Sequence, residues 1–359
     1  MQRKRIAIFA GKLFRCKCGI LAVLGALFFS LISFTTTAFS APQPDSKNVA
    51  NISSHPSNGW RLVSSENNQK SYKVAVIYPD IGEPYRSIFT NIIGGIEDAL
   101  QSRVLGYAIN KGIDTKSLED DLRRYRIGVI VALGRNGLKV ASTLDSDSRI
   151  VAGGVIWAPQ KNTEAISVVS LAPDPDLLFS QLTKMAPSIG RVFVVYNSRQ
   201  NQWLLDIAKR SAASRNIELV AFDANDIKSA FGYYKEILDD IDPKHDALWL
   251  PQDSTTVNDA AILAFILEQA WKKSIALFSS SVVHVKRGAL FSLYPNNKEL
   301  GKQLGSIALN ILKKPNITKG VVFPLKSVLT AVNVRTASHL GLALSYRDQQ
   351  DFDLVFPQP

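Results

Sequence analysis

The sequence predicts an α/β protein with two lobes, each built on a parallel sheet flanked by helices. Three observations support this. Short apolar runs rich in β-branched residues alternate with helix-length segments from residue 73 onward, which is typical of parallel sheets. The chain has 359 residues and is 46% hydrophobic, enough for two domains with large cores. The alternation pauses at Pro173 and Pro175 and then restarts, which places a crossing between lobes there.

The N-terminal 40 residues have the pattern of a signal peptide. Six Lys and Arg residues precede an uncharged apolar run over residues 19–34, and the small residues Ala38 and Ser40 precede a cleavage position before Ala41. We therefore expect an exported, periplasmic protein. The alternative is that the apolar run is retained as a membrane anchor, since about 18 apolar residues suffice to span a bilayer. The basic flank stays cytoplasmic in both cases, so the folded part faces outward.

Charge and cysteine content exclude several classes of protein. Of the 42 Lys and Arg residues, six lie in residues 1–40, which contain no acid, so the rest of the chain has 36 against 31 Asp and Glu, a net charge of +5. This small excess forms no basic run or aromatic ladder, so we expect no nucleic-acid partner. Cys16 and Cys18 both precede the apolar run, so the exported part lacks disulfides, thiolate metal sites and a lipid-bearing cysteine.

The predicted elements follow one another from residue 73, after a polar linker over residues 41–72 that is rich in Ser and Asn. Apolar runs of strand length predict strands at 73–78, 127–133, 150–156, 191–196, 218–222, 247–250, 274–278 and 289–293. Helix-length segments predict helices at 85–101, 138–144, 177–185, 203–215, 227–241, 258–271 and 298–312. Each helix is long enough to cover one face of a sheet.

Enzyme signatures are missing from the sequence. The chain has no phosphate-binding loop, no glycine-rich dinucleotide fingerprint after the first strand, no nucleophile elbow and no zinc-binding H-E-x-x-H. No two of the four histidines share a helical turn, and the pair Asp120-Asp121 is typical of a solvated surface. We therefore predict no catalytic residue, metal or cofactor; a hydrolase with an unfamiliar site is a distant alternative.

In open α/β sheets, ligands bind beyond the carboxyl ends of the strands. In the first half, these positions are the loops at residues 79–84 and 134–137. Arg135 and Asn136 lie at a predicted helix start, where a cation is unfavourable unless an anionic group is nearby. The alternative is that Arg135 extends into water. Trp157 provides either an aromatic wall for a ligand or a plug between the lobes.

The second half places three polar loops at one predicted edge. Asn197 and Ser198, then Asp253 and Ser254, and finally the serine run 279–281 each follow a predicted strand. Asp253 and Ser254 are also favourable capping residues for the helix that begins near residue 257. The sequence is therefore compatible with two roles for Asp253: capping a helix and contacting a ligand amine.

Three C-terminal motifs carry a family resemblance. They are Asp246-Ala-Leu-Trp-Leu-Pro-Gln-Asp253, then Gly288-Ala-Leu-Phe-Ser292 leading into Leu300-Gly-Lys-Gln-Leu-Gly305, and Ala331-Val-Asn-Val-Arg-Thr-Ala-Ser-His-Leu-Gly341. From about residue 73 to 345, the chain resembles the substrate-binding proteins of ABC transporters that have the type I periplasmic-binding fold, a family that includes aromatic amino-acid binders.

The resemblance implies an organisation in which the chain crosses between lobes several times. Residues 73–172 and about 297–315 would form the first lobe, residues 173–296 and about 316–345 the second, and residues 346–359 a tail. The implied function is to close on a small solute, an amino acid or another carboxylate, and to present it to a membrane permease. The positions that would contact the solute are Tyr78, Asn197, Ser198, Asp253, Ser280 and Ser281.

The first-lobe loop departs from the family pattern. The family has a small hydroxyl residue followed by alanines where this chain has Gly134-Arg-Asn-Gly137, and the Thr-Gly that precedes the second lobe is absent from residues 168–173. A binding lobe can keep its fold after losing its pocket. The second hypothesis is therefore an interaction or sensor module that binds a protein partner and has a degenerate cleft.

Overall fold

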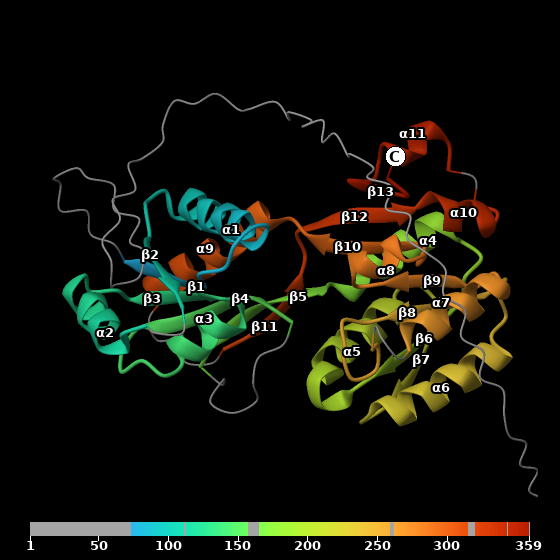
Figure 1. Cartoon of the computed structure of the whole chain (residues 1–359), viewed down its shortest axis with the longest axis horizontal. Coiled ribbons are helices and arrows are strands. Elements are labelled where there is room, and N and C mark those ends of the chain that lie inside the picture. The colour runs from blue at the N-terminus through green and yellow to red at the C-terminus, as the bar shows by residue number, and fades with distance from the viewer. Residues whose placement is uncertain are drawn as a thin grey trace, which may run out of the picture. The chain divides into compact units, whose positions relative to one another are not determined.

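The computed structural model describes residues 73–110, 113–156, 165–258, 262–314, 320–342 and 344–358. These residues form two sheets with helices on both faces (Figure 1). All but one of the strand pairs are parallel, the exception being β10 with β12. The α/β class and the two parallel-dominated sheets are therefore confirmed. The predicted signal peptide, the linker and Trp157 lie outside the described residues.

The first lobe is built on a parallel sheet in which the strand order is β11-β5-β4-β3-β1-β2. Its strands are β1 (Val74–Pro79), β2 (Leu105–Ile109), β3 (Val129–Leu133), β4 (Arg149–Val155), β5 (Ser167–Pro173) and β11 (Val322–Leu325). Its helices are α1 (Tyr85–Leu100), α2 (Thr115–Arg124), α3 (Gly134–Ala141) and α9 (Asn297–Lys313). Successive residues of β1 face opposite sides, so Val74 and Val76 pack under α1 and α9, whereas Ala75 and Ile77 pack against α2 and α3.

The second lobe has the strand order β13-β12-β10-β9-β8-β6-β7. Its strands are β6 (Arg191–Tyr196), β7 (Glu218–Asp223), β8 (Asp246–Leu250), β9 (Ala276–Ser279), β10 (Phe291–Pro295), β12 (Val328–Asn333) and β13 (Leu354–Phe356). Its helices are α4 (Pro175–Met185), α5 (Ser198–Ala213), α6 (Ile227–Asp240), α7 (Leu263–Lys272), α8 (Val282–Lys286), α10 (Val334–His339) and α11 (Tyr346–Gln349). Helices α4 and α5 cover one face around Trp249, and α6 and α7 cover the other around Leu248.

Helix α9 packs against α1 at backbone distance, although about 200 residues separate the two helices in the sequence (Figure 1). A Cβ atom at Gly95 would lie 2.0 Å from the carbonyl oxygen of Lys298, and one at Gly301 would lie 2.0 Å from that of Ile92. Only glycine fits at these two positions. The missing side chains let Leu300 and Leu304 reach the sheet core of the first lobe.

The chain passes between the sheets after β5, after β10 and after β11. Backbone hydrogen bonds join the crossing segments: Asp174 N donates to Leu325 O at 2.9 Å, and Asn296 N donates to Ser327 O at 3.1 Å. These bonds hold the three crossings beside one another.

Two of the expected domain limits are wrong. Strand β11 pairs with β5, with Val322 opposite Val168, so it belongs to the first lobe and not to the second. The expected C-terminal tail contains β13, which pairs in parallel with β12 at the edge of the second sheet. Both are edge strands of three or four residues, which are too short to show a hydrophobic period in the sequence.

Candidate functional site

The second lobe brings its predicted site residues to one edge of its sheet. Strands β9, β8 and β6 are neighbours in that sheet and run parallel. Asn197 and Ser198 follow β6, Asp253 and Ser254 lie in the loop after β8, and Ser280 and Ser281 follow β9. Because the carboxyl ends of parallel strands lie at one edge, the three loops meet there, as ligand sites of α/β sheets require.

Asp253 is buried at this edge, with only 4% of its surface exposed. Its Oδ2 accepts hydrogen bonds from Asn197 N at 2.8 Å and from Asn201 Nδ2 at 2.9 Å. Its Oδ1 accepts from Thr255 N at 2.9 Å and from Thr256 N at 3.4 Å. These bonds bind its own loop and the start of α5. Asp253 does not cap α7 as expected, because that helix begins at Leu263 with Ile262 as its N-cap residue.

Asn197 and Ser280 are buried and bonded within the second lobe as well. The Asn197 side chain caps α5 by accepting from Arg199 N at 3.1 Å, and its Nδ2 donates to Ala224 O at 3.1 Å. Ser280 Oγ accepts from Trp249 Nε1 at 3.1 Å. Both side chains therefore hold the lobe together beneath the edge.

The residues that directly follow Asn197, Asp253 and Ser280 in the sequence lie at the surface of this edge. Ser254 is exposed, and Ser198 and Ser281 are partly exposed. The backbone N of Ser198 donates to Asp223 Oδ1 at 2.9 Å, and that of Ser281 donates to Ser279 Oγ at 3.0 Å. The groups that face solvent here include these small hydroxyls, which suit hydrogen bonding to a neutral or charged solute, and the exposed side chain of Arg199.

Ser279 and His284 form a buried hydrogen-bonded pair next to Ser281. Ser279 Oγ lies 2.7 Å from His284 Nδ1 and 3.2 Å from Leu250 O. Both residues are at most 6% exposed. The pair ties the start of α8 to the end of β8.

The first lobe places Tyr78, Arg135 and Asn136 at its own carboxyl edge. Tyr78 lies near the end of β1, with its ring centre 6.0 Å from that of Phe89. Burial is the main cause that raises the pKa of the Tyr78 hydroxyl; the charge of Asp80 adds to the rise, and that of Arg86 opposes it. This hydroxyl is therefore a neutral hydrogen-bonding group at physiological pH.

Arg135 and Asn136 are exposed in the first turn of α3. The helix starts at Gly134, where φ is +70°, and no side chain caps its first N–H groups. A Cβ atom at Gly137 would lie 2.7 Å from the carbonyl oxygen of Ile77, so this glycine lets α3 approach β1 closely. The glycines of the 134–137 loop thus set the position of Arg135.

Two exposed apolar residues at the same edge were not predicted from the sequence. Ile81 is 41% exposed and Tyr85 is 54% exposed. They flank the turn that leads from β1 into α1, which lies in the loop selected as a first-lobe candidate. The signal that could have identified them is a pair of large apolar side chains beside glycine and proline, where a loop usually carries polar ones.

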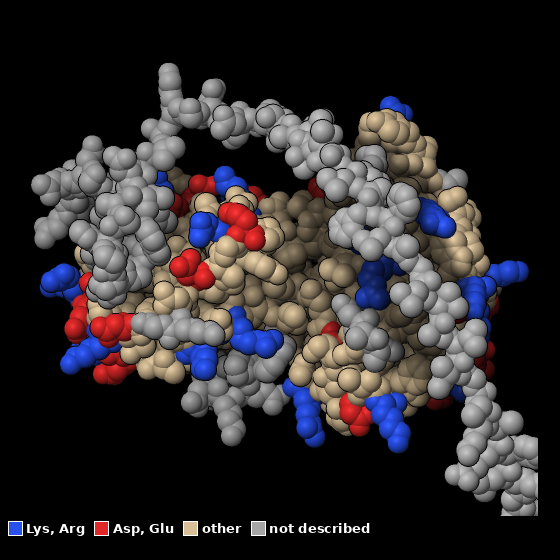
Figure 2. Space-filling model, viewed as in Figure 1, with Lys and Arg blue, Asp and Glu red and all other residues tan. Residues whose placement is uncertain are grey.

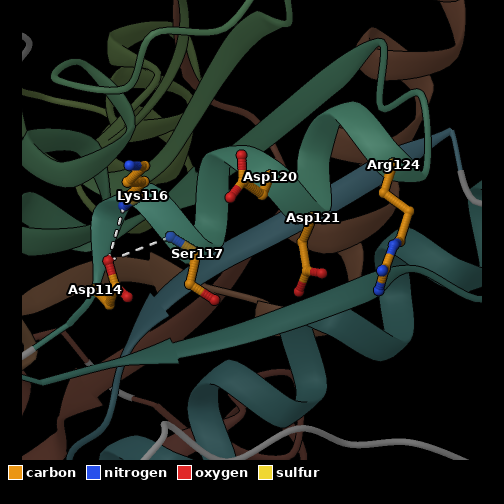
Figure 3. A pocket seen from close by; sticks show the side chains of 6 residues that line it. All are labelled: Asp114, Lys116, Ser117, Asp120, Asp121 and Arg124. Carbon is orange, nitrogen blue, oxygen red and sulfur yellow. Dashed lines mark hydrogen bonds between the residues drawn. The ribbon is translucent and has the colours of Figure 1, made fainter.

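A hollow of about 350 Å³ lies along α2 and not among the predicted site residues (Figure 3). It is lined by Asp114, Lys116, Ser117, Asp120, Asp121 and Arg124. Asp114 caps the helix by accepting from Lys116 N and Ser117 N at 3.0 and 3.2 Å, the two dashed bonds of Figure 3. The charged side chains of one solvated helix explain this hollow, as expected for Asp120 and Asp121.

Charges are mixed over the face drawn in Figure 2, where Lys and Arg side chains lie among Asp and Glu side chains. In the part of the chain that the structure describes, no three His, Cys, Asp or Glu side chains gather as a metal site. No helix formed by the described residues is long and apolar enough to cross a membrane.

Two parallel-dominated sheets flanked by helices form the two lobes of a fold of the periplasmic-binding type. A family model described as "ABC transporter substrate binding protein" matches residues 152–347. The chain belongs to this family. Its members bind substrates and are not enzymes, so the expectation of a non-enzyme is confirmed.

One solved structure supports the same fold, and two others are similar to this chain. A ligand-free, open substrate-binding protein with adhesive properties from Clostridium difficile is 18% identical, with a TM-score of 0.55, over 79% of this chain and 99% of that one. An ABC domain in complex with L-Trp from Streptococcus pneumonia is 15% identical, with a TM-score of 0.49, over 80% and 100%. A conserved domain protein from Vibrio cholerae is 19% identical, with a TM-score of 0.47, over 80% and 100%. No curated protein matches the sequence.

Proposed function

We propose that this chain is the exported, solute-binding component of an ABC importer and that it closes on a small ligand between its two lobes. The observation that carries the proposal is the meeting of three polar loops at the carboxyl ends of β6, β8 and β9, in a chain of this family. A ligand that contacts both lobes only in the closed form shifts the population toward that form. The closed form is then presented to a membrane permease.

The proposed ligand is an amino acid or another small carboxylate. Arg135, exposed in the uncapped first turn of α3, is the group that would bind the carboxylate, with Asn136 beside it. Tyr78 would line the same lobe; Trp157, the other candidate of this half, lies outside the described residues. The second lobe would contribute the hydroxyls of Ser198, Ser254 and Ser281, while Asn197, Asp253 and Ser280 support them from below.

A second candidate function is supported by one observation. Asn197, Asp253 and Ser280, three of the positions implied to contact a solute, are buried and bonded within the second lobe. If no other side chains contacted a solute in their place, the cleft would have lost its ability to bind one. The chain would then be an interaction module that binds a protein partner.

A thermal-shift screen of the purified chain against amino acids, aromatic acids, nucleosides and peptides distinguishes the two functions. A solute at 100 times its dissociation constant adds about 2.7 kcal/mol to the free energy of unfolding. We expect a carboxylate-bearing compound to raise Tm and Arg135→Ala to abolish the shift. Arg124→Ala, a matched variant on the exposed surface of α2, should preserve it. No shift across the whole panel would support the interaction module.

A further inference from the structure

The carboxylate of Asp253 has no acceptor site left for a ligand. A carboxylate offers about four lone-pair sites, and each Asp253 oxygen accepts two N–H bonds, from Asn197 and Asn201 at Oδ2 and from Thr255 and Thr256 at Oδ1. All four donors are neutral. A ligand amine could reach this 4% exposed group only by displacing some of these bonds.

The four donors come from two different loops. Thr255 and Thr256 lie in the β8–α7 loop with Asp253 itself, whereas Asn197 and Asn201 lie at the start of α5. Asn197 extends the connection, because its Nδ2 donates to Ala224 O after β7. The loops after β6, β7 and β8 are thus joined through one buried acid and two asparagines.

We propose that Asp253 and Asn201 are a positioning pair, which fixes the polar edge of the second lobe without touching the solute. This inference rests on the proposed function. Ser198 follows Asn197 directly and Ser254 follows Asp253 directly, so the bonds of the buried pair set where these two hydroxyls lie. Asn201 connects helix α5 to the β8–α7 loop. It lies in the first turn of α5, and its Nδ2 donates a hydrogen bond to Asp253 Oδ2 at 2.9 Å.

Tyr234 provides a matched control in the same buried neighbourhood. Its side chain is 0% exposed, and the Asp253 charge is one of the causes that raise the pKa of its hydroxyl, after burial. That hydroxyl is not one of the four donors to Asp253, and a side-chain hydrogen bond with Thr256 opposes the rise of its pKa. Tyr234→Phe therefore changes the cluster but leaves the positioning pair intact.

Hydrogen exchange of the full-length chain tests the pair without any ligand. In Asn201→Leu, we expect the amides of Asn197, Thr255 and Thr256 to exchange at least ten times faster, while the amides of β6 and β8 keep the wild-type rates. Tyr234→Phe should leave the three loop amides unchanged. Loop amides that keep their wild-type rates in Asn201→Leu, or equal acceleration throughout the lobe, would overturn the proposal.

Measurements of ligand affinity distinguish a positioning role of the pair from a general effect on the stability of the fold. For L-amino acids of the panel that bind the wild-type chain, Asn201→Leu should raise Kd about tenfold. Tyr234→Phe should change Kd less than twofold, even if it lowers Tm as much as Asn201→Leu does. Unchanged affinity in a variant with accelerated loop exchange would overturn the positioning role. If no compound of the panel binds the wild type, the proposed function fails, and the exchange rates alone decide whether the pair fixes the loops.

Discussion

At the scale of single residues, buried charges are placed at both ends of the second sheet. At the carboxyl edge, Asp253 is surrounded by neutral donors. At the opposite edge, Asp246 is 1% exposed and forms a bidentate pair with Arg191, at 2.9 Å from Nε to Oδ1 and 2.6 Å from Nη2 to Oδ2. Asp246 Oδ2 also accepts from Asp242 N at 2.8 Å. The sequence identified Asp246 only as part of a motif, since its partner lies 55 positions away.

Removing this carboxylate should destabilise the fold. Asp246→Ala leaves the Asp242 amide and the partly exposed Arg191 guanidinium without their acceptor, so the free energy of unfolding should decrease. Urea unfolding of the variant measures the loss. Asp239→Ala is the control, because Asp239 is exposed and its contact with Lys273 is 3.8 Å, so its effect should stay within about 0.5 kcal/mol. Equal losses in both variants would contradict this account.

The buried phenol of Tyr234 should make the fold sensitive to alkaline pH. Burial raises the pKa of Tyr234 above that of the unfolded chain, which is about 10. Its contribution to stability is therefore complete below pH 10 and decreases as the pH rises further, because only the unfolded chain then releases the proton. The free energy of unfolding should decrease more between pH 9 and 11 for the wild type than for Tyr234→Phe. Parallel pH dependences would refute this assignment.

At the scale of elements, the sequence located most of the long apolar segments, but it missed the apolar strands β5 and β12 as well as several short or polar elements. The expected helix at 298–312 corresponds to α9, and that at 85–101 to α1. Helix α2 was missed because only Leu118 and Leu122 are buried, which leaves no apolar stripe. Strand β2 was missed because it is a five-residue edge strand containing a glycine. The tight contact of α1 with α9 depends on pairs of glycines that no local pattern connects.

Adjacent glycines of α1 should respond in opposite ways to alanine. Gly95→Ala places a Cβ atom 2.0 Å from Lys298 O and forces the helices apart, so the free energy of unfolding should decrease by about 1–3 kcal/mol. Gly94→Ala meets no atom within 4 Å and should stabilise the helix by about 0.5–1 kcal/mol. Thermal unfolding of the two variants measures the difference. The same sign of effect in both would contradict the close packing.

For the candidate site, the sequence located the three polar loops, because each directly follows an apolar strand. It left open whether Asp253 caps a helix or binds a ligand; the structure shows that it does not cap α7 and that its carboxylate accepts hydrogen bonds from Asn197 and Asn201. These donors are 56 and 52 positions away, so their approach depends on the pairing of β6 with β8. Sequence patterns identify which loops form an edge, but not which side chains are enclosed beneath it.

At the scale of the whole molecule, the fold is two separate cores joined by three crossings of the chain. Each sheet is covered on both faces by its own helices, so each lobe can keep its structure when the other changes position. Backbone hydrogen bonds join the crossing segments. This arrangement suits closure by rotation about the crossings, with little change inside the lobes.

Closure on a solute is tested most directly by energy transfer between dyes on the two lobes. The only native cysteines are Cys16 and Cys18, so after their replacement by serine, Lys116→Cys on α2 and Lys228→Cys on α6 are labelled specifically. The account predicts that a carboxylate compound of the panel changes the transfer efficiency in a saturable manner, and that Arg135→Ala abolishes this change. A constant efficiency across the whole panel would contradict a solute-binding function.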